Sequence, residues 1–584
     1  MSRQTRYKRR RGRRVVPVLA IAVVALVVGA VVGSDHGPPY TRNLATEFTK
    51  SWATRDYSAM YDDIDGAARR ATSESAFAAV YREALTTATA TTVRVSGKAR
   101  ELADGAITVP VVVVTRLFGT LRMRFTLRFR GTGEAARIAW SRSLEFPGLT
   151  AGELLTRRMA LPPRASLLDR EGGVLASGPA EAAGERYSPL GAAASSVVGE
   201  VGPIPSGERA TLEGEGVPSG AIVGVNGLER IFDAQLRGKP GGKLLAGSRV
   251  IATAKAQPGR SVRTTISASL QEATVRALGE HYGGVVVQQP STGQILAVAG
   301  IGLDGLQPPG STFKMVTVTG VLQSGIAKPA TTFPYKSEAV LDGVKLKNSE
   351  AESCGGTLIL SFAVSCNSVF APLGVKLGAK RLVAVAERYG FNHAPGIPGA
   401  AESTIPAARD IQGELDVGST SIGQGEVLAS PLEMATVAAT IADGGLRHEP
   451  TDALGRPTRT VRVSSPAIAA EVRTMMIHVV TEGTGDPNAQ IPGVVVAGKT
   501  GTAELGNANA SGCSSESSSG SSSSSGSGCS AQVEKEDTDG WFAAFAPAED
   551  PKLAVGVLMV RDGFGADSAA PVAKEILEAG LGLG

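Results

Sequence analysis

The chain has 584 residues, of which 42% are hydrophobic and 20% charged. This composition excludes a disordered chain, and the length predicts three or four domains. The net charge is +4, but residues 1–14 hold eight basic side chains and no acidic one, which leaves 51 basic against 55 acidic residues elsewhere. No basic stripe with interleaved aromatic residues follows this tail, so we expect no nucleic-acid partner.

Residues 15–33 form an uncharged run of mainly Val, Ala, Leu, Ile and Gly that is long enough to cross a bilayer as one helix. The basic residues before it predict a cytoplasmic N-terminus and an extracytoplasmic remainder. A cleaved signal peptide is the alternative, because residues 31–33 are a passable cleavage site. The length of the run favours an uncleaved, single-pass membrane anchor.

Residues 38–148 are predicted to form one small α+β domain. Aromatic and apolar residues recur at helical spacing from Tyr40 to Tyr61, and a second helix is predicted from Ser75 to Thr87. Alternating segments then predict strands at 92–95, 107–117, 121–129 and 138–144.

Residues 149–270 are rich in Gly, Pro and charge and form a second, non-catalytic segment. It is too short for a glycosyltransferase domain and lacks an acidic catalytic motif. We therefore expect a monofunctional protein.

The pattern changes again for residues 271–584, which we predict to be a catalytic domain. A helix is expected at 267–280, a hairpin at 283–287 and 294–299, strands at 496–503, 541–546 and 554–560, and a last helix at 571–581. These segments predict a five-stranded antiparallel sheet with helices on its faces. Helices starting near 311, 358 and 380 would form a helical lobe beside it.

Three short motifs stand in order in this domain: Ser311-Thr312-Phe313-Lys314, Ser365-Cys366-Asn367 and Lys499-Thr500-Gly501, followed by Thr502. Each motif alone is weak evidence, since a Ser-x-Asn segment normally marks a loop or a helix cap. Their order, and the suitable structure predicted around each, carries the weight.

The first motif predicts a serine acyltransferase whose base is a lysine. A serine hydroxyl is a poor nucleophile until a base takes its proton. The spacing of three residues places Lys314 on the same face of a helical turn as Ser311. To act as a base, Lys314 must be neutral, with its pKa lowered from about 10.4 by burial and by the nearby charge of Lys499.

The three motifs resemble those of penicillin-binding proteins and serine β-lactamases. Cys366 replaces the Asp of the Ser-Asp-Asn form, which favours a transpeptidase over a β-lactamase. Residues 421–426 and 539–547 also resemble segments around the transpeptidase cleft. The helix with Phe48 and Trp52 resembles the NTF2-like N-terminal domain of the low-affinity, methicillin-resistance type.

The resemblance as a whole is to class B penicillin-binding proteins. It implies a multidomain α+β protein with a 1–14 tail, a 15–33 transmembrane helix, a 38–148 NTF2-like domain, a 149–270 dimerisation or pedestal domain and a 271–584 transpeptidase domain. In that family, Arg and Glu residues of the pedestal form structural ion pairs, so Arg164, Asp169 and Glu229 are expected to be architectural.

The resemblance also implies a role for each motif residue. Ser311 is the expected nucleophile, Lys314 its base, and Ser365 the relay of the proton to the leaving amine. Asn367 is expected to hold the amide of the stem peptide. The expected substrate-binding residues on the third motif are Lys499, Thr500, Gly501 and Thr502.

The implied activity is peptidoglycan D,D-transpeptidation in the bacterial cell membrane, without metal or cofactor. The implied partners are stem peptides ending in D-Ala-D-Ala, β-lactams, the membrane and a separate glycosyltransferase. The alternatives are a D,D-carboxypeptidase, a β-lactamase, and a non-turnover membrane-anchored β-lactam sensor or scaffold. No Glu-x-x-x-Asn segment that would favour a β-lactamase lies between the second and third motifs.

The four cysteines form two pairs along the sequence. Cys513 and Cys529 lie in a Ser/Gly-rich insertion at 507–531, and we predict a disulfide between them, worth about 3 kcal/mol by loop entropy. Cys354 and Cys366 are too far apart to bond if a continuous helix joins them, and a break in that helix leaves their pairing open. His393, His448 and His478 show no evident Asp partner, so no Ser-His-Asp triad is expected.

Overall fold

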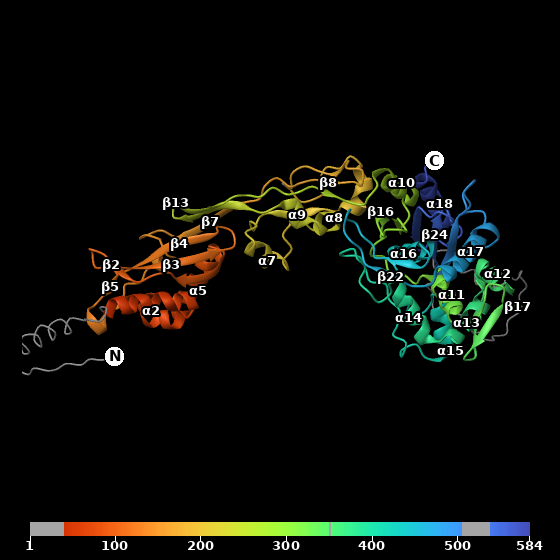
Figure 1. Cartoon of the computed structure of the whole chain (residues 1–584), viewed down its shortest axis with the longest axis horizontal. Coiled ribbons are helices and arrows are strands. Elements are labelled where there is room, and N and C mark those ends of the chain that lie inside the picture. The colour runs from red at the N-terminus through yellow and green to blue at the C-terminus, as the bar shows by residue number, and fades with distance from the viewer. Residues whose placement is uncertain (1–39, 181, 350–351, 505–537, 584) are drawn as a thin grey trace, which may run out of the picture. The chain divides into compact units, whose positions relative to one another are not determined.

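The structure is a computed structural model that describes residues 40–180, 182–349, 352–504 and 538–583 (Figure 1). The predicted tail, membrane anchor and Ser/Gly-rich insertion, with Cys513 and Cys529, lie outside the described residues. Within the described ranges, no helix has both the length and the apolar character needed to cross a membrane.

The chain folds as two compact units. The described part of the first unit runs to Ala160 and includes Glu208–Ser219 and Pro240–Ala256. The second unit contains Leu161–Gly207, Gly220–Lys239 and the chain from Gln257 onward. Because the chain returns twice to the first unit, residues 149–270 contribute to both.

The first unit packs helices against an antiparallel sheet in which β3 pairs with β1, β2 and β4. Phe48 and Trp52 of the first helix are fully buried, and the Trp52 ring meets Phe125 of β4 edge-on at 4.8 Å. A second sheet has the order β13-β12-β7. The elements of this unit are α2 (Tyr40–Thr54), α3 (Tyr57–Asp62), α4 (Gly66–Ala71), α5 (Glu74–Thr87), β1 (Ala90–Val95), β2 (Arg100–Glu101), β3 (Ile107–Thr115), β4 (Thr120–Leu127), β5 (Phe129–Arg130), β6 (Arg137–Ile138), β7 (Leu155–Ala160), α7 (Arg209–Gly214), β12 (Gly241–Ala246) and β13 (Arg249–Ala254).

Two predicted elements of this unit are wrong. The helix expected from Tyr40 to Tyr61 is divided, because Arg55 has a φ of +63° and the Asp56 side chain then caps a new helix by accepting the amide of Ala59. The strand expected at 138–144 stops at Ile138, and a 3-10 turn follows at Arg142–Leu144.

The second unit begins with short elements that surround a buried ion cluster. Arg164 and Arg186 each lie 2.7 Å from a carboxylate oxygen of Glu229, and Arg164 also pairs with Asp233. Asp169 accepts the backbone amides of residues 171–173. These contacts hold the short elements together, as is expected of residues with an architectural role. The elements here are β8 (Leu167–Leu168), β9 (Val174–Ala176), α6 (Ser195–Val198), β10 (Val201–Pro203), β11 (Ile222–Gly224), α8 (Gly227–Ile231), α9 (Asp233–Arg237) and β14 (Val262–Arg263).

The predicted five-stranded antiparallel sheet is confirmed, with the order β16-β15-β25-β24-β23. Every residue of β24 is buried, and its side chains alternate between two hydrophobic clusters, Phe542 joining one and Phe545 the other. Helices α10 and α18 pack on one face and α16 on the other. The bounds are α10 (Ala268–Leu278), β15 (Gly283–Gln288), β16 (Ile295–Gly300), α16 (Pro431–Ala442), β23 (Ala497–Glu504), β24 (Thr538–Ala546), β25 (Leu553–Met559) and α18 (Ala569–Gly580).

A mostly helical lobe packs beside this sheet around the largest hydrophobic cluster. At its centre is α11, whose first nine residues are all buried. The remaining elements are η4 (Gly310–Phe313), α11 (Lys314–Gln323), β17 (Thr332–Lys336), β18 (Glu338–Leu341), β19 (Val344–Lys347), β20 (Cys354–Thr357), α12 (Leu358–Ala363), α13 (Asn367–Leu377), α14 (Ala379–Tyr389), α15 (Gly413–Ser421), β21 (Leu446–His448), β22 (Thr460–Arg462) and α17 (Pro466–Glu482).

The buried ion cluster yields a stability prediction. Glu229 is fully buried, and Glu229→Ala would leave buried Arg186 without its carboxylate and Arg164 with Asp233 alone, which lowers the free energy of unfolding by about 3–5 kcal/mol. Urea-induced unfolding followed by circular dichroism measures the change. Glu171→Ala removes an exposed carboxylate 3.7 Å from Arg170, and its effect should stay below about 1 kcal/mol. Equal effects of the two substitutions would contradict the architectural role.

Candidate active site

The first motif lies where the helical lobe begins. Ser311 is in the 3-10 turn η4, and Lys314 is the first residue of α11, so the two side chains share one helical turn. Lys314 Nζ lies 2.9 Å from Ser311 Oγ. Lys314 is fully buried, whereas Ser311 is partly exposed. The nucleophile expected from the sequence is thus open to solvent while its base is not.

The second motif forms the turn between α12 and α13 and contacts the same lysine. Lys314 Nζ donates to the Ser365 carbonyl oxygen at 2.7 Å and to Asn367 Oδ1 at 2.6 Å, and it lies 3.2 Å from Ser365 Oγ. Ser365 has a φ of +58°, a conformation that costs a non-glycine residue free energy. This turn brings a carbonyl, a hydroxyl and an amide to one nitrogen.

The contacts of Lys314 fit a neutral amine. The Ser365 carbonyl and Asn367 Oδ1 accept only, so they take the two N–H groups that a neutral amine has. In the neutral amine, the remaining lone pair can accept from one of the two serine hydroxyls within reach, Ser311 Oγ at 2.9 Å and Ser365 Oγ at 3.2 Å. Burial, and secondarily the charge of Lys499, holds the pKa of Lys314 well below 10.5, in the direction this arrangement requires.

The third motif lies on β23, the edge strand of the five-stranded sheet. Lys499 is fully buried, and its Nζ donates to the Thr500 carbonyl oxygen at 3.0 Å and lies 5.7 Å from the centre of the Phe362 ring. Burial lowers the pKa of Lys499 to about 7. Near neutral pH, Lys499 is therefore divided between its charged and its neutral form.

The first and third motifs touch through a glycine. Gly310 has a φ of +50°, and a Cβ atom on it would lie 2.4 Å from the carbonyl oxygen of Thr502. In a strand, the N–H and C=O of one residue point to the same side, so the Thr502 amide also faces this turn. The backbone amides of Ser311 and Thr502 thus belong to two segments that meet at Gly310.

The structure adds residues that the sequence analysis missed. Thr484, which follows α17, has its hydroxyl 2.5 Å from that of Thr500. The Phe370 ring lies 5.8 Å from Lys314 Nζ, and Asn367 Nδ2 donates to the backbone of Lys347 at 3.0 Å. Only a periodic apolar pattern marks the phenylalanines, and nothing in the sequence distinguishes Thr484 from other loop threonines.

The remaining cysteine pair, whose bonding was left open, is joined. Cys354 and Cys366 form a disulfide with their Cα atoms 5.8 Å apart. The condition of a continuous helix between them is not met, because Cys354 begins strand β20 and the helix α12 covers only Leu358–Ala363. The middle residue of the second motif is therefore cross-linked to another segment.

The histidines show one departure from expectation. His448 has an acidic partner after all, since its Nε2 lies 2.8 Å from Asp443. Neither residue hydrogen-bonds to Ser311. In the described part of the chain, no group of three or more His, Cys, Asp or Glu side chains is placed to hold a metal ion.

Comparison with known families shows to which family a chain with this geometry belongs. The "Penicillin binding protein transpeptidase domain" matches residues 283–578, the "Penicillin-binding Protein dimerisation domain" residues 179–264, and the "NTF2-like N-terminal transpeptidase domain" residues 41–153. The first match covers half of the chain, and all three motifs lie within it. The chain belongs to the penicillin-binding protein transpeptidase family.

Individual relatives agree with this assignment. The peptidoglycan D,D-transpeptidase PbpA of Mycolicibacterium smegmatis is 31% identical over 422 residues, which are 61% of this chain and 79% of that protein. A D,D-transpeptidase domain from Eggerthella lenta has 27% identity and a TM-score of 0.57, over 73% of this chain and 99% of that one. Penicillin-binding protein A from M. tuberculosis, solved as a ceftriaxone acyl-enzyme complex, has 25% identity and a TM-score of 0.56, over 72% and 98%. The resemblance to this family and to an NTF2-like N-terminal domain is confirmed, while the domain boundaries inferred from the sequence stay predictions.

The two buried lysines predict a bell-shaped pH dependence. The second-order rate constant for acylation by a penicillin should rise as Lys314 loses its proton, because only the neutral amine accepts one. It should fall above a pH of about 7, where Lys499 loses the positive charge that, from the sequence, we expect to attract the penicillin carboxylate. Stopped-time labelling with a fluorescent penicillin between pH 5 and 10 measures the profile.

Lys499→Arg serves as the control, because an arginine stays charged throughout this range. Its profile should lose the alkaline limb, even where its absolute rates are lower. A wild-type rate that still rises above pH 9 would rule out a charged Lys499 as the carboxylate site.

Proposed function

We propose that this protein cross-links peptidoglycan stem peptides as a serine D,D-transpeptidase, with Ser311 as the nucleophile and Lys314 as its base. The observation that carries the proposal is the 2.9 Å contact between Ser311 Oγ and a buried lysine whose N–H groups are already engaged by two carbonyl oxygens. In the neutral amine, the lone pair is then left for a serine hydroxyl, and Ser311 Oγ is the nearer of the two within reach.

In the first step, Ser311 Oγ attacks the carbonyl carbon of the penultimate D-Ala of a stem ending in D-Ala-D-Ala, and Lys314 takes the hydroxyl proton. The carbonyl oxygen becomes an oxyanion. The backbone amides of Ser311 and Thr502, which meet at Gly310, are the proposed donors to it.

Collapse of the tetrahedral intermediate releases D-Ala. Ser365 Oγ, 3.2 Å from Lys314 Nζ, is the proposed relay of the proton to the leaving amine. An amine of a neighbouring stem then attacks the acyl-enzyme, its proton returns along the same path, and Ser311 is regenerated with a new peptide bond formed.

The substrate is held from both sides of Ser311. Lys499, Thr500, Gly501 and Thr502 on β23 are the proposed binding segment for the terminal carboxylate, with Lys499 supplying the positive field. Asn367 Nδ2 has two hydrogens, and only one is given to Lys347, so the second is available for the stem amide. A β-lactam carries the same carboxylate and a reactive amide, and would acylate Ser311 by the same steps.

The location we propose follows from the sequence. Residues 1–14 would lie in the cytoplasm and 15–33 would cross the bacterial cell membrane, which places both described units outside it. The NTF2-like domain would act as a spacer from the membrane. The resemblance to class B penicillin-binding proteins supports a separate glycosyltransferase as the proposed source of the glycan strands.

Ser311→Ala tests the nucleophile. Labelling by a fluorescent penicillin should be stable on the wild type and fall more than about 1,000-fold in the variant, because the attacking oxygen is gone. Ser324→Ala, an exposed serine that follows the same helix, should label like the wild type. Label that persists in Ser311→Ala would refute the mechanism.

The fate of the acyl group separates the transpeptidase from its alternatives. With a pentapeptide donor and an amine acceptor, we expect D-Ala release together with a new amide product. Release of D-Ala with only the hydrolysed tetrapeptide would indicate a carboxypeptidase. Rapid loss of bound penicillin would indicate a β-lactamase, and stable label without D-Ala release a sensor.

A further inference from the structure

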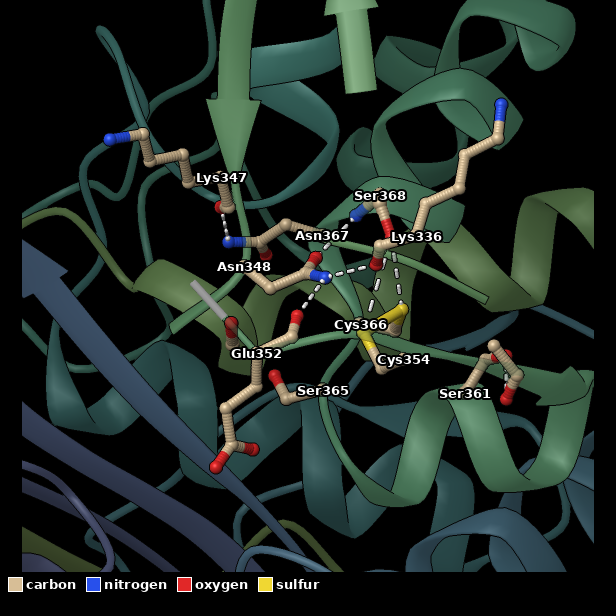
Figure 2. The surroundings of a disulfide bond; sticks show 12 residues. Lys336, Lys347, Asn348, Glu352, Cys354, Ser361, Ser365, Cys366, Asn367 and Ser368 are labelled. Atoms are coloured by element: carbon tan, nitrogen blue, oxygen red, sulfur yellow. Dashed lines mark hydrogen bonds between the residues drawn. A yellow bond between two sulfur atoms is a disulfide. The ribbon is translucent and has the colours of Figure 1, made fainter. Parts of the chain in front are cut away.

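The turn that carries Ser365 and Asn367 is also held by a covalent bond. Cys366, between these two residues, is fully buried and forms a disulfide with Cys354 at the start of β20 (Figure 2). Strand β20 pairs with β17, where Lys336 stands opposite Cys354. The disulfide therefore ties the motif turn to a two-stranded sheet that carries none of the three motifs.

Hydrogen bonds around the disulfide converge on the same sheet. The Ser368 amide donates to Asn348 Oδ1 at 2.8 Å, and Asn348 Nδ2 donates to the Lys336 carbonyl at 2.7 Å. The Ser368 hydroxyl donates to the same carbonyl at 3.1 Å and lies 3.3 Å from Cys366 Sγ. These bonds orient the start of α13, while the sulfur bridge sets how far residue 366 lies from β20.

The two residues that flank Cys366 make the contacts to Lys314. The residues on either side of Cys366 supply the two oxygens that Lys314 Nζ contacts at 2.7 and 2.6 Å. Ser365 holds a left-handed backbone conformation that persists only where its surroundings impose it. A displacement of Cys366 therefore moves both acceptors of Lys314 and the Ser365 hydroxyl together.

We propose that the Cys354–Cys366 disulfide positions Ser365 and Asn367 on Lys314, and that its reduction by a dithiol slows acylation of Ser311. This inference rests on the proposed function, because the disulfide acts through Lys314 and does not touch the substrate. The two cysteines are positioning residues.

The redox step balances as ordinary thiol–disulfide exchange. A thiolate of the dithiol attacks Cys354 Sγ, the less buried sulfur of the pair, and the electrons of the S–S bond leave on Cys366, which takes up a proton. The second thiol of the dithiol closes on the mixed disulfide and releases Cys354 as a thiol. The dithiol ends as a cyclic disulfide after giving up two electrons and two protons.

The test is the kinetics of penicillin acylation by the full-length protein in detergent, before and after treatment with dithiothreitol. The maximal acylation rate should fall roughly 10- to 100-fold on reduction, since small displacements of catalytic groups have effects of this size. The half-saturating penicillin concentration should change less than the maximal rate does, because the carboxylate site on β23 stays in place and only the Asn367 contact to the amide is shifted. Reoxidation should restore the rate, and Cys354→Ser should behave like the reduced wild type.

A matched control isolates this disulfide from the second cysteine pair. The double variant Cys513→Ser/Cys529→Ser keeps only Cys354 and Cys366 and should lose activity on reduction as the wild type does. Rates are referred to the folded fraction, measured by circular dichroism at the assay temperature.

Three results would overturn the inference. They are an unchanged maximal rate when alkylation shows both cysteines reduced, a loss of rate fully accounted for by unfolding, and a rise in the half-saturating concentration without a change in the maximal rate. Failure of the proposed function is distinct: the oxidised wild type would then carry no label on Ser311, or would fail to form the amide product from a pentapeptide donor and an amine acceptor.

Discussion

The candidate active site depends on one buried nitrogen, Nζ of Lys314, whose pKa is lowered by burial. A neutral amine has two N–H groups and one lone pair, and the contacts match this set, with two carbonyl oxygens that only accept and two serine hydroxyls that can donate. With the N–H groups given to Ser365 and Asn367, the lone pair is left for a serine hydroxyl, of which Ser311 Oγ is the nearer. The fold therefore lowers the pKa of Lys314 by burial and also surrounds its Nζ with groups that suit a neutral amine.

Lys499, the second buried lysine, would change the proton affinity of Lys314 when a substrate carboxylate binds. A charged Lys499 lowers the pKa of Lys314, and among the described residues no carboxylate is paired with Lys499. A bound carboxylate would therefore be its first anionic partner and would neutralise the field that it exerts on Lys314. The affinity of Lys314 for a proton should then rise when substrate is in place, which favours transfer of the Ser311 proton at that moment.

The sequence predicts those parts of the site that depend on local geometry. The contact between Ser311 and Lys314 follows from a spacing of three residues in one helical turn, and the strands of the main sheet follow from runs of buried apolar residues. Contacts between segments distant in sequence have no such signal. Thr484 beside Thr500 and His448 beside Asp443 result from tertiary packing, which periodicity does not encode.

The same limit explains the errors in the local predictions. A single left-handed residue, Arg55, ends a helix whose apolar pattern continues past it, and a short strand at Cys354–Thr357 interrupts what the sequence allowed as one helix. At Cys354, the departure brings together groups that a regular helix would hold apart. For Cys354 and Cys366, this is the step that makes their bond possible.

The site combines several features that each lower stability, namely two buried lysines and a serine in a left-handed conformation. The surroundings offset them with extensive burial, since α11 is buried along nearly its whole length and β24 along all of it. Gly310 then lets the turn before α11 approach the edge strand without an intervening side chain. The sheet edge and the left-handed turn are thus held at the same serine, so that the proposed oxyanion donors, base and relay come together only where the two packed elements meet.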